Sequence, residues 1–195
     1  MVWPTNYGHL ATGTMFTIFF AGNEYTPNLL INGEQAQDFL QKHFLGALEV
    51  VVNTLKNERN VLGYDLFNEP SEGFVGVEDI SSFYWPLRSG YIMNLFDAFQ
   101  LGSGYSIPLD YYSKSFVYNH TEIINPNNKS AWEDGFNCVW KEHGIWSDEN
   151  GVPVLHMKDY FKTVPSSKKE PNFLNDFAKP FYTEAANIIH SINEE

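Results

Sequence analysis

The sequence predicts an α/β fold, specifically an incomplete (β/α)8 TIM barrel that carries a long, aromatic-rich insertion. Three observations lead to this prediction. An amphipathic helix over residues 40–55 is followed by an apolar run at 61–67 with the length and composition of a buried strand. A second amphipathic helix spans residues 174–192. Between them, residues 71–158 are rich in glycine, proline and tryptophan and show only short local patterns, as functional insertions do. We therefore take 1–195 as one partial barrel domain with the insertion at 71–158.

The helices follow from the spacing of apolar residues. The first segment, 3–21, favours a helix, although its apolar end at 16–21 leaves a buried strand open as an alternative. The motif Asn32-Gly33-Glu34-Gln35 resembles a capping box at the start of the second helix, which should stop near residues 57–60. In the last helix, Pro180 predicts a kink or a break. The apolar stripe of the second helix is Leu40, Phe44, Leu48, Val51, Val52 and Leu55.

Composition excludes several classes of protein. The net charge is −12 and no run is rich in Lys or Arg, so strong non-specific binding to nucleic acid or anionic membranes is not expected. No stretch of about 18 apolar residues predicts a transmembrane helix, and the N-terminal region resembles a secretory signal poorly. The single cysteine, Cys138, excludes an intrachain disulfide and a multi-cysteine metal site. These features favour an intracellular protein, cytoplasmic or vacuolar, with no stable membrane insertion.

The run at 61–67 ends in Asn68-Glu69-Pro70, the strongest chemical signal in the sequence. A carboxylate at the C-terminal end of a parallel strand points into the mouth of a barrel, where such folds carry out catalysis. If the enzyme is a glycosidase, a glutamate placed like Glu69 would protonate the leaving glycosidic oxygen and later deprotonate water. The neighbouring Asn68 would hydrogen-bond a sugar hydroxyl. The alternative is a surface Asn-Glu-Pro turn without chemistry.

This stretch, Tyr64-Asp-Leu-Phe-Asn-Glu-Pro70, resembles the acid/base strand of glycoside hydrolase family 5. Further blocks resemble its fungal, endoglycoceramidase-related branch of glucosylceramidases and steryl β-glucosidases, and together they cover nearly the whole chain. Those blocks are Trp3-Pro-Thr-Asn-Tyr7, the segment 14–22, Ala131-Trp-Glu-Asp-Gly135, the segment 140–146 and Lys158-Asp-Tyr-Phe161.

The resemblance implies a retaining β-glycosidase on a (β/α)8 barrel that hydrolyses the β-glucosyl bond of glycolipids, either glucosylceramide or steryl glucoside. It implies no metal and no organic cofactor. Glu69 matches the family's general acid/base and Asn68 its neighbouring substrate ligand. The expected partner is a glycolipid or another β-glucoside.

The sequence departs from that family in length and in carboxylates. A (β/α)8 barrel takes roughly 250 residues, more than this chain has. Retaining hydrolysis needs two carboxyl groups about 5 Å apart, and no second glutamate follows a predicted strand. We therefore expect a middle fragment of a longer enzyme. The alternative is a non-catalytic remnant that lacks the nucleophile, with residual sugar or lipid binding. The glutamates considered and set aside are Glu72, Glu78, Glu122, Glu133 and Glu142.

Four tryptophans in the insertion have two interpretations. They would either form a wall for an apolar aglycone or pack as the insertion's own core. His143, between two of them, is interpreted as a hydrogen-bonded structural residue, and Cys138 as a buried small hydrophobe. The tryptophans are Trp85, Trp132, Trp140 and Trp146.

Overall fold

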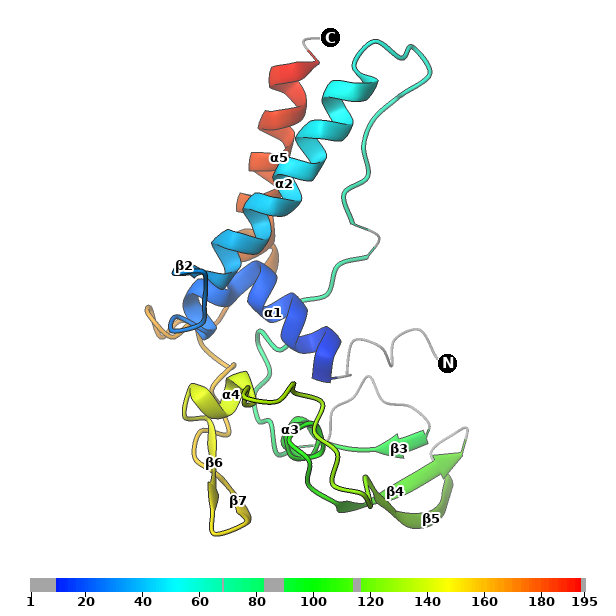
Figure 1. Cartoon of the computed structure of the whole chain (residues 1–195), viewed down its shortest axis with the longest axis vertical. Coiled ribbons are helices and arrows are strands. Elements are labelled where there is room, and N and C mark those ends of the chain that lie inside the picture. Colours follow the sequence, from blue (N-terminus) through cyan, green and yellow to red (C-terminus); the bar gives the residue numbers. More distant parts are fainter. Residues whose placement is uncertain (1–9, 68, 83–89, 114–116, 194–195) are drawn as a thin grey trace.

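The computed structural model describes residues 10–67, 69–82, 90–113 and 117–193 (Figure 1). The helices at 10–25, 36–55 and 179–192, with a short hairpin at 30–35, form one part of the molecule, and the strands and two small helices between residues 90 and 155 form the other. The elements in chain order are α1 (Leu10–Tyr25), β1 (Leu30–Ile31), β2 (Glu34–Gln35), α2 (Ala36–Leu55), β3 (Gly90–Ile92), α3 (Leu95–Gly102), β4 (Ile107–Ser113), β5 (Val117–Ile124), α4 (Val139–Glu142), β6 (Trp146–Glu149), β7 (Val152–Leu155), the π-helix η2 (Phe173–Ala178) and α5 (Lys179–Ile192).

The helical part consists of α2 and α5 side by side, with α1 packed against the beginning of α2 (Figure 1). The predicted first segment, 3–21, is a helix from Leu10 onward, its residues 3–9 lie outside the described residues, and the strand alternative at 16–21 is wrong. Ala21 leaves helical geometry, with φ −135° and ψ 19°, so α1 bends there. Pro180 lies in the first turn of α5, directly after η2. The predicted break is confirmed, since one helix ends and the next begins just before Pro180. Proline is tolerated in a first turn because its missing N–H would have no helical partner there.

The capping box predicted at 32–35 is wrong. Asn32 and Gly33 have φ of 53° and 83°, and they form the two-residue turn of a hairpin that pairs Leu30 with Gln35. Positive φ at both positions is the geometry that Asn-Gly favours in tight hairpins. Helix α2 begins one residue later than the hairpin ends, with Gln35 at its N-cap and no side-chain cap.

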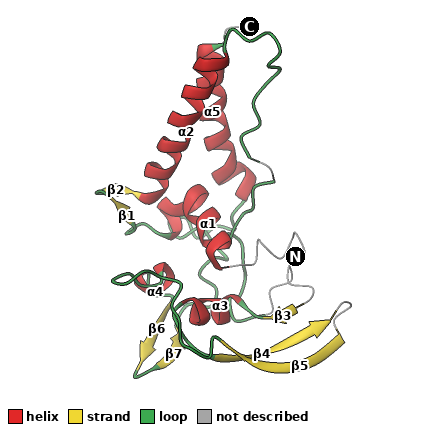
Figure 2. Ribbon diagram, turned by 45° about the vertical axis from the view of Figure 1, so that its right-hand side comes forward, coloured by secondary structure: helices red, strands yellow, loops and turns green. Residues whose placement is uncertain are grey.

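The remaining strands form small antiparallel sheets (Figure 2). The largest has the order β3-β4-β5, with a register shift between Tyr111 and Tyr112. Strands β6 and β7 form a separate hairpin around the turn at Asn150 and Gly151. The described residues contain no closed barrel and no parallel strand pair.

The strand predicted at 61–67 is absent from the structure. These residues follow α2 as an irregular segment, and none of them donates a backbone hydrogen bond to a described residue except Val61, which bonds Glu58 O at 3.1 Å. A strand exists only where a neighbour satisfies its N–H and C=O groups, and no described strand lies beside this one. An apolar run alone therefore did not decide the secondary structure.

Aromatic side chains build the core in two adjoining groups. One joins the three long helices to the segment after α2, through Phe19, Phe20, Phe44, Phe67 and Phe181. The other joins α3 and α4 to the segments at 74 and 161, through Phe74, Phe99, Trp140 and Phe161. Burying one such ring contributes about 2 to 3 kcal/mol. None of the described helices combines the length and the apolar composition that crossing a bilayer requires.

Candidate functional site

The predicted acid/base, Glu69, lies at a sharp turn of the backbone. Its φ is 53°, a left-handed value that non-glycine residues rarely adopt, and its side chain is exposed. Pro70 follows at once, and proline restricts the residue before it. The predicted substrate ligand, Asn68, lies outside the described residues. The structure therefore places one of the two predicted site residues, on a strained turn.

Before Glu69, the chain is held by packing of side chains, among which the Phe67 ring makes the aromatic contacts. Phe67 stacks on Phe44 of α2 with centroids 4.8 Å apart, and it meets Phe19 of α1 edge-on at 5.4 Å. Further back, residues 63–66 border a groove of about 390 Å³ against α2. Leu62 is fully exposed. The approach to Glu69 is thus held by apolar packing, with Tyr64, Leu66 and Phe67 each half-buried against the core.

After Glu69, the chain is docked onto α1 by backbone and side-chain hydrogen bonds. Ser71 Oγ accepts a hydrogen bond from Gly73 N at 3.1 Å. Phe74 N donates to Thr17 Oγ1 at 2.8 Å, and Thr17 Oγ1 donates to Gly13 O at 2.7 Å. All of these groups are buried. The turn behind Glu69 is therefore held by directional bonds.

Sequence reasoning missed Thr17, Gly13 and Gly73, the residues that hold this turn. Their contact joins positions 57 residues apart, which no local pattern encodes. The sequence offers one weak signal, because Gly73 follows the Asn-Glu-Pro motif closely; in the structure its φ is 62°. A glycine just beyond a functional turn often marks a close backbone approach.

Two ionisable groups outside the Glu69 turn, Asp79 and Cys138, have shifted pKa values. Hydrogen bonds from the Ser81 hydroxyl and backbone N–H, followed by the Lys158 ammonium, lower the pKa of Asp79 to about 2. Burial raises the pKa of the Cys138 thiol, so the thiol stays protonated and Cys138 packs as a small hydrophobe, as predicted. Within the described part of the chain, no three His, Cys, Asp or Glu side chains gather as a metal site.

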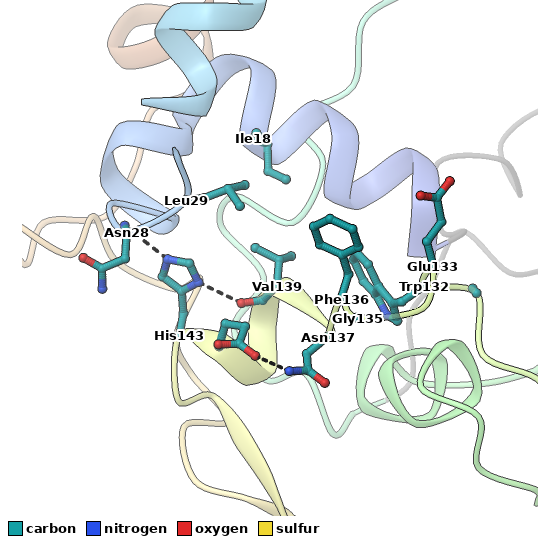
Figure 3. A pocket seen from close by; sticks show the side chains of 12 residues that line it. Ile18, Asn28, Leu29, Trp132, Glu133, Gly135, Phe136, Asn137, Val139 and His143 are labelled. Atoms are coloured by element: carbon teal, nitrogen blue, oxygen red, sulfur yellow. Dashed lines mark hydrogen bonds between the residues drawn. The ribbon is translucent and has the colours of Figure 1, made fainter. Parts of the chain in front are cut away.

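A second region with binding chemistry is a groove of about 780 Å³ between α1 and the segment around α4 (Figure 3). Its apolar walls include Ile18 of α1 and Leu29, facing Trp132 and the exposed ring of Phe136. Glu142 supplies the polar side, where its Oε1 accepts a hydrogen bond from Asn137 Nδ2 at 2.7 Å. Aromatic faces beside a carboxylate suit a sugar or an apolar aglycone.

His143 lines the same groove as a structural residue. Its Nδ1 lies 2.7 Å from Val139 O, and its Nε2 lies 3.4 Å from Asn28 N (Figure 3). Nδ1 therefore carries the proton and donates, while Nε2 accepts from the Asn28 amide. Both ring nitrogens are occupied, which confirms the structural interpretation.

The tryptophans divide between the two interpretations. Trp140 and Trp146 are 0% and 1% exposed, and the Trp140 indole N–H donates to Thr14 Oγ1 at 2.9 Å. These two are core. Trp132 is half-buried and lines the groove, so it retains the possible role of a ligand-facing wall. Trp85 lies outside the described residues.

Comparison with known proteins places the chain beside fungal glycosidases. No protein-family model matches it. It is 37% identical over 202 residues to a glucosylceramidase of Rhizopus delemar and 33% identical over 228 residues to the ergosteryl-β-glucosidase of Saccharomyces cerevisiae. Each match takes in 100% of this chain and 29% of the relative.

The structural comparison agrees. The crystal structure of sterylglucosidase 1 of Cryptococcus neoformans superposes with a TM-score of 0.89 at 26% identity, over 100% of this chain and 31% of that one. The chain thus spans less than a third of the length of the relatives it matches. In sequence and in structure, it is homologous from end to end to one portion of the fungal glucosylceramidases and steryl β-glucosidases, which are glycoside hydrolases.

Proposed function

We propose that this chain carries the general acid/base of a retaining β-glucosidase that hydrolyses glucosylceramide or steryl glucosides. The observation that supports this most is the position of Glu69, on a strained turn after Phe67 and before Pro70, in a chain homologous to such enzymes throughout its length. Family 5 membership and a (β/α)8 barrel are part of the same proposal. Residues 71–158 would then be an insertion into that barrel.

In this proposal, Glu69 acts twice. It first donates its proton to the glycosidic oxygen, so that the bond from that oxygen to the anomeric carbon breaks as a second carboxylate bonds the same carbon. It then takes a proton from the water that displaces this carboxylate, and glucose leaves with its original configuration. Asn68 would hold a hydroxyl of the glucosyl ring. The second carboxylate would come from the portion of the relatives that this chain does not match.

The test uses the polypeptide that carries this sequence, with all flanking residues that its transcript encodes. Release of glucose is measured from glucosylceramide, a steryl glucoside and an aryl β-glucoside. Glu69→Gln should lower kcat at least ~10²-fold, because the amide cannot exchange the proton. Glu72→Gln, an exposed glutamate in the same turn, is the matched control and should leave kcat unchanged. Full activity in Glu69→Gln would overturn the proposal.

A second measurement identifies the role of Glu69. In Glu69→Ala, added azide should restore turnover of the aryl glucoside and yield β-glucosyl azide, because azide needs no general base to attack the anomeric carbon. An α-azide would instead indicate that Glu69 is the nucleophile.

One observation favours the alternative of a non-catalytic, glycolipid-binding chain. Glu69 is exposed, whereas a general acid works in an enclosed site. That alternative predicts binding of a steryl glucoside without release of glucose by the same polypeptide. Turnover that Glu69→Gln abolishes would exclude it.

A further inference from the structure

We propose that Thr17 is a positioning residue for Glu69, and that its buried hydroxyl holds the turn behind Glu69 in the orientation catalysis requires. This inference rests on the proposed function of Glu69. It assigns a role to a residue on α1, far from the Asn-Glu-Pro motif in sequence.

The hydroxyl of Thr17 bridges two backbone groups. It accepts from Phe74 N at 2.8 Å and donates to Gly13 O at 2.7 Å, while Thr17 itself is 0% exposed. Phe74 N therefore has a hydroxyl, not a backbone carbonyl, as its partner. When a methyl group takes the place of that hydroxyl, as in valine, Phe74 N–H loses its acceptor in the interior.

Two glycines allow this close approach. A Cβ on Gly73 would lie 2.4 Å from Thr17 Oγ1 and 2.7 Å from Gly13 O. A Cβ on Gly13 would lie 2.2 Å from the ring of Phe74. The backbone of the turn thus lies directly on α1, and the Thr17 bond fixes its register there.

This contact has a consequence for Glu69, four residues before Gly73. A left-handed φ at a non-glycine residue persists only when the surrounding structure imposes it. Ring packing at Phe67 restrains one side of Glu69. On the other side, Pro70 connects Glu69 to Ser71, whose Oγ accepts from Gly73 N and so ties the residues just after Glu69 to the part held by Thr17. The direction of the carboxylate is therefore coupled to one buried hydroxyl.

The test compares Thr17→Val, which removes the hydroxyl at nearly constant volume, with Thr17→Ser, which keeps it. Thr26→Val is the matched control. Thr26 is also buried in this region, and its Oγ1 also bonds the carbonyl four residues earlier, Gly22 O at 3.0 Å, without reaching the turn. All variants are made in the complete polypeptide, and their melting temperatures are recorded. Thr17→Ala is a second variant should Thr17→Val not fold.

The measured quantity is kcat/KM, which reports cleavage of the glycosidic bond, for two substrates. With a steryl glucoside, Thr17→Val should lose about 10-fold, because a misplaced acid protonates the poor leaving group badly. With 2,4-dinitrophenyl β-glucoside, whose leaving group needs no proton, the loss should stay below about 2-fold. Thr17→Ser and Thr26→Val should retain wild-type values for both.

Two results would overturn the role of Thr17: equal losses for the two substrates, or a profile in Thr17→Val that matches Thr26→Val. Failure of the proposed function is distinguished by Glu69→Gln. If Glu69→Gln hydrolyses both substrates normally, the acid/base assignment fails. If Glu69→Gln is inactive on the steryl glucoside while Thr17→Val is not selectively impaired, only the positioning role fails.

Discussion

The two sides of Glu69 are held in different ways. Residues 61–67, before it, are held by the half-buried side chains of Tyr64, Leu66 and Phe67 beside a groove against α2, and Leu62 is fully exposed. Residues 71–77, after it, are docked by a buried hydroxyl and two glycines, and Gly76 N donates to Phe161 O at 2.9 Å. The difference shows that half of the candidate site is preformed within this chain. The half that precedes Glu69 lacks backbone hydrogen bonds to the described residues, apart from the one that Val61 donates.

The largest expected difference in the free energy of unfolding is between alanine substitutions at Phe74 and at Phe67. Phe74→Ala should lower the free energy of unfolding by about 4 kcal/mol, because the ring is fully buried against Phe99, Trp140 and Phe161. Phe67→Ala should cost about 2 kcal/mol, because that ring is only half-buried. Urea denaturation of the complete polypeptide measures both. An equal or larger loss at Phe67 would contradict the comparison.

Alanine substitutions at Gly73 and Gly63 compare how tightly the backbone is packed after and before Glu69. Gly73→Ala should cost about 3 kcal/mol, because the new Cβ would overlap Thr17 and Gly13 at a φ of 62°. Gly63→Ala should change stability by less than about 0.5 kcal/mol, because nothing lies within 4 Å of the added carbon. The melting temperatures of both variants test this. Loss of stability at Gly63 would indicate that another segment packs against 61–67.

Amide hydrogen exchange separates the two segments without mutation. The amides of Phe74, Gly76 and Val77 are hydrogen-bonded and should exchange at least ~10²-fold more slowly than those of 62–67. The amides of 62–67 have no hydrogen-bond acceptor among the described residues. Strong protection at 62–67 in the complete polypeptide would show that a neighbouring strand pairs with this run, as in a parallel barrel.

The smallest expected effect on stability is at Asp79, just beyond the docked segment 71–77. The Ser81 and Lys158 contacts lower the pKa of Asp79 from 3.8 to about 2. The contribution of these contacts to stability is therefore fully present above pH 3.8, and it is lost as the pH falls toward about 2. Wild type and Asp79→Asn should differ in urea midpoint at pH 5 and converge near pH 2. If the two urea midpoints still differ at pH 2, the negative charge of the Asp79 carboxylate is not the cause of the difference.

The sequence predicted local features well and contacts between distant segments poorly. The apolar stripe of α2 is predictable because it depends on neighbours along the helix, and Leu48 and Val52 are buried as expected. The prediction for Val51 is wrong, because it is 47% exposed, and the buried Leu45 lies outside the predicted stripe. Asn32-Gly33 fits two local motifs, and the backbone φ values decided for a hairpin. The run at 61–67 was taken for a strand, although a strand also requires a partner.

The candidate site divides in the same way. Glu69 could be predicted because its motif is contiguous and resembles a known family. Thr17 could not, because its role arises only where α1 meets the turn 57 residues later. The alternatives for the tryptophans could be separated only by burial, which gave Trp140 and Trp146 to the core and left Trp132 on a groove.

The position of Phe181 in the aromatic core has a consequence for synthesis on the ribosome. This ring on α5 contacts Phe19 of α1, Phe44 of α2 and Phe67, the residue two positions before Glu69. Helices α1 and α2 emerge and pair early, but their aromatic cluster stays open until more than one hundred further residues are translated. Such late closure leaves apolar surface exposed in the nascent chain. The aromatic cluster before Glu69 thus closes only after α5 has been translated, and a ribosome-bound chain that ends before α5 should be a target for chaperones.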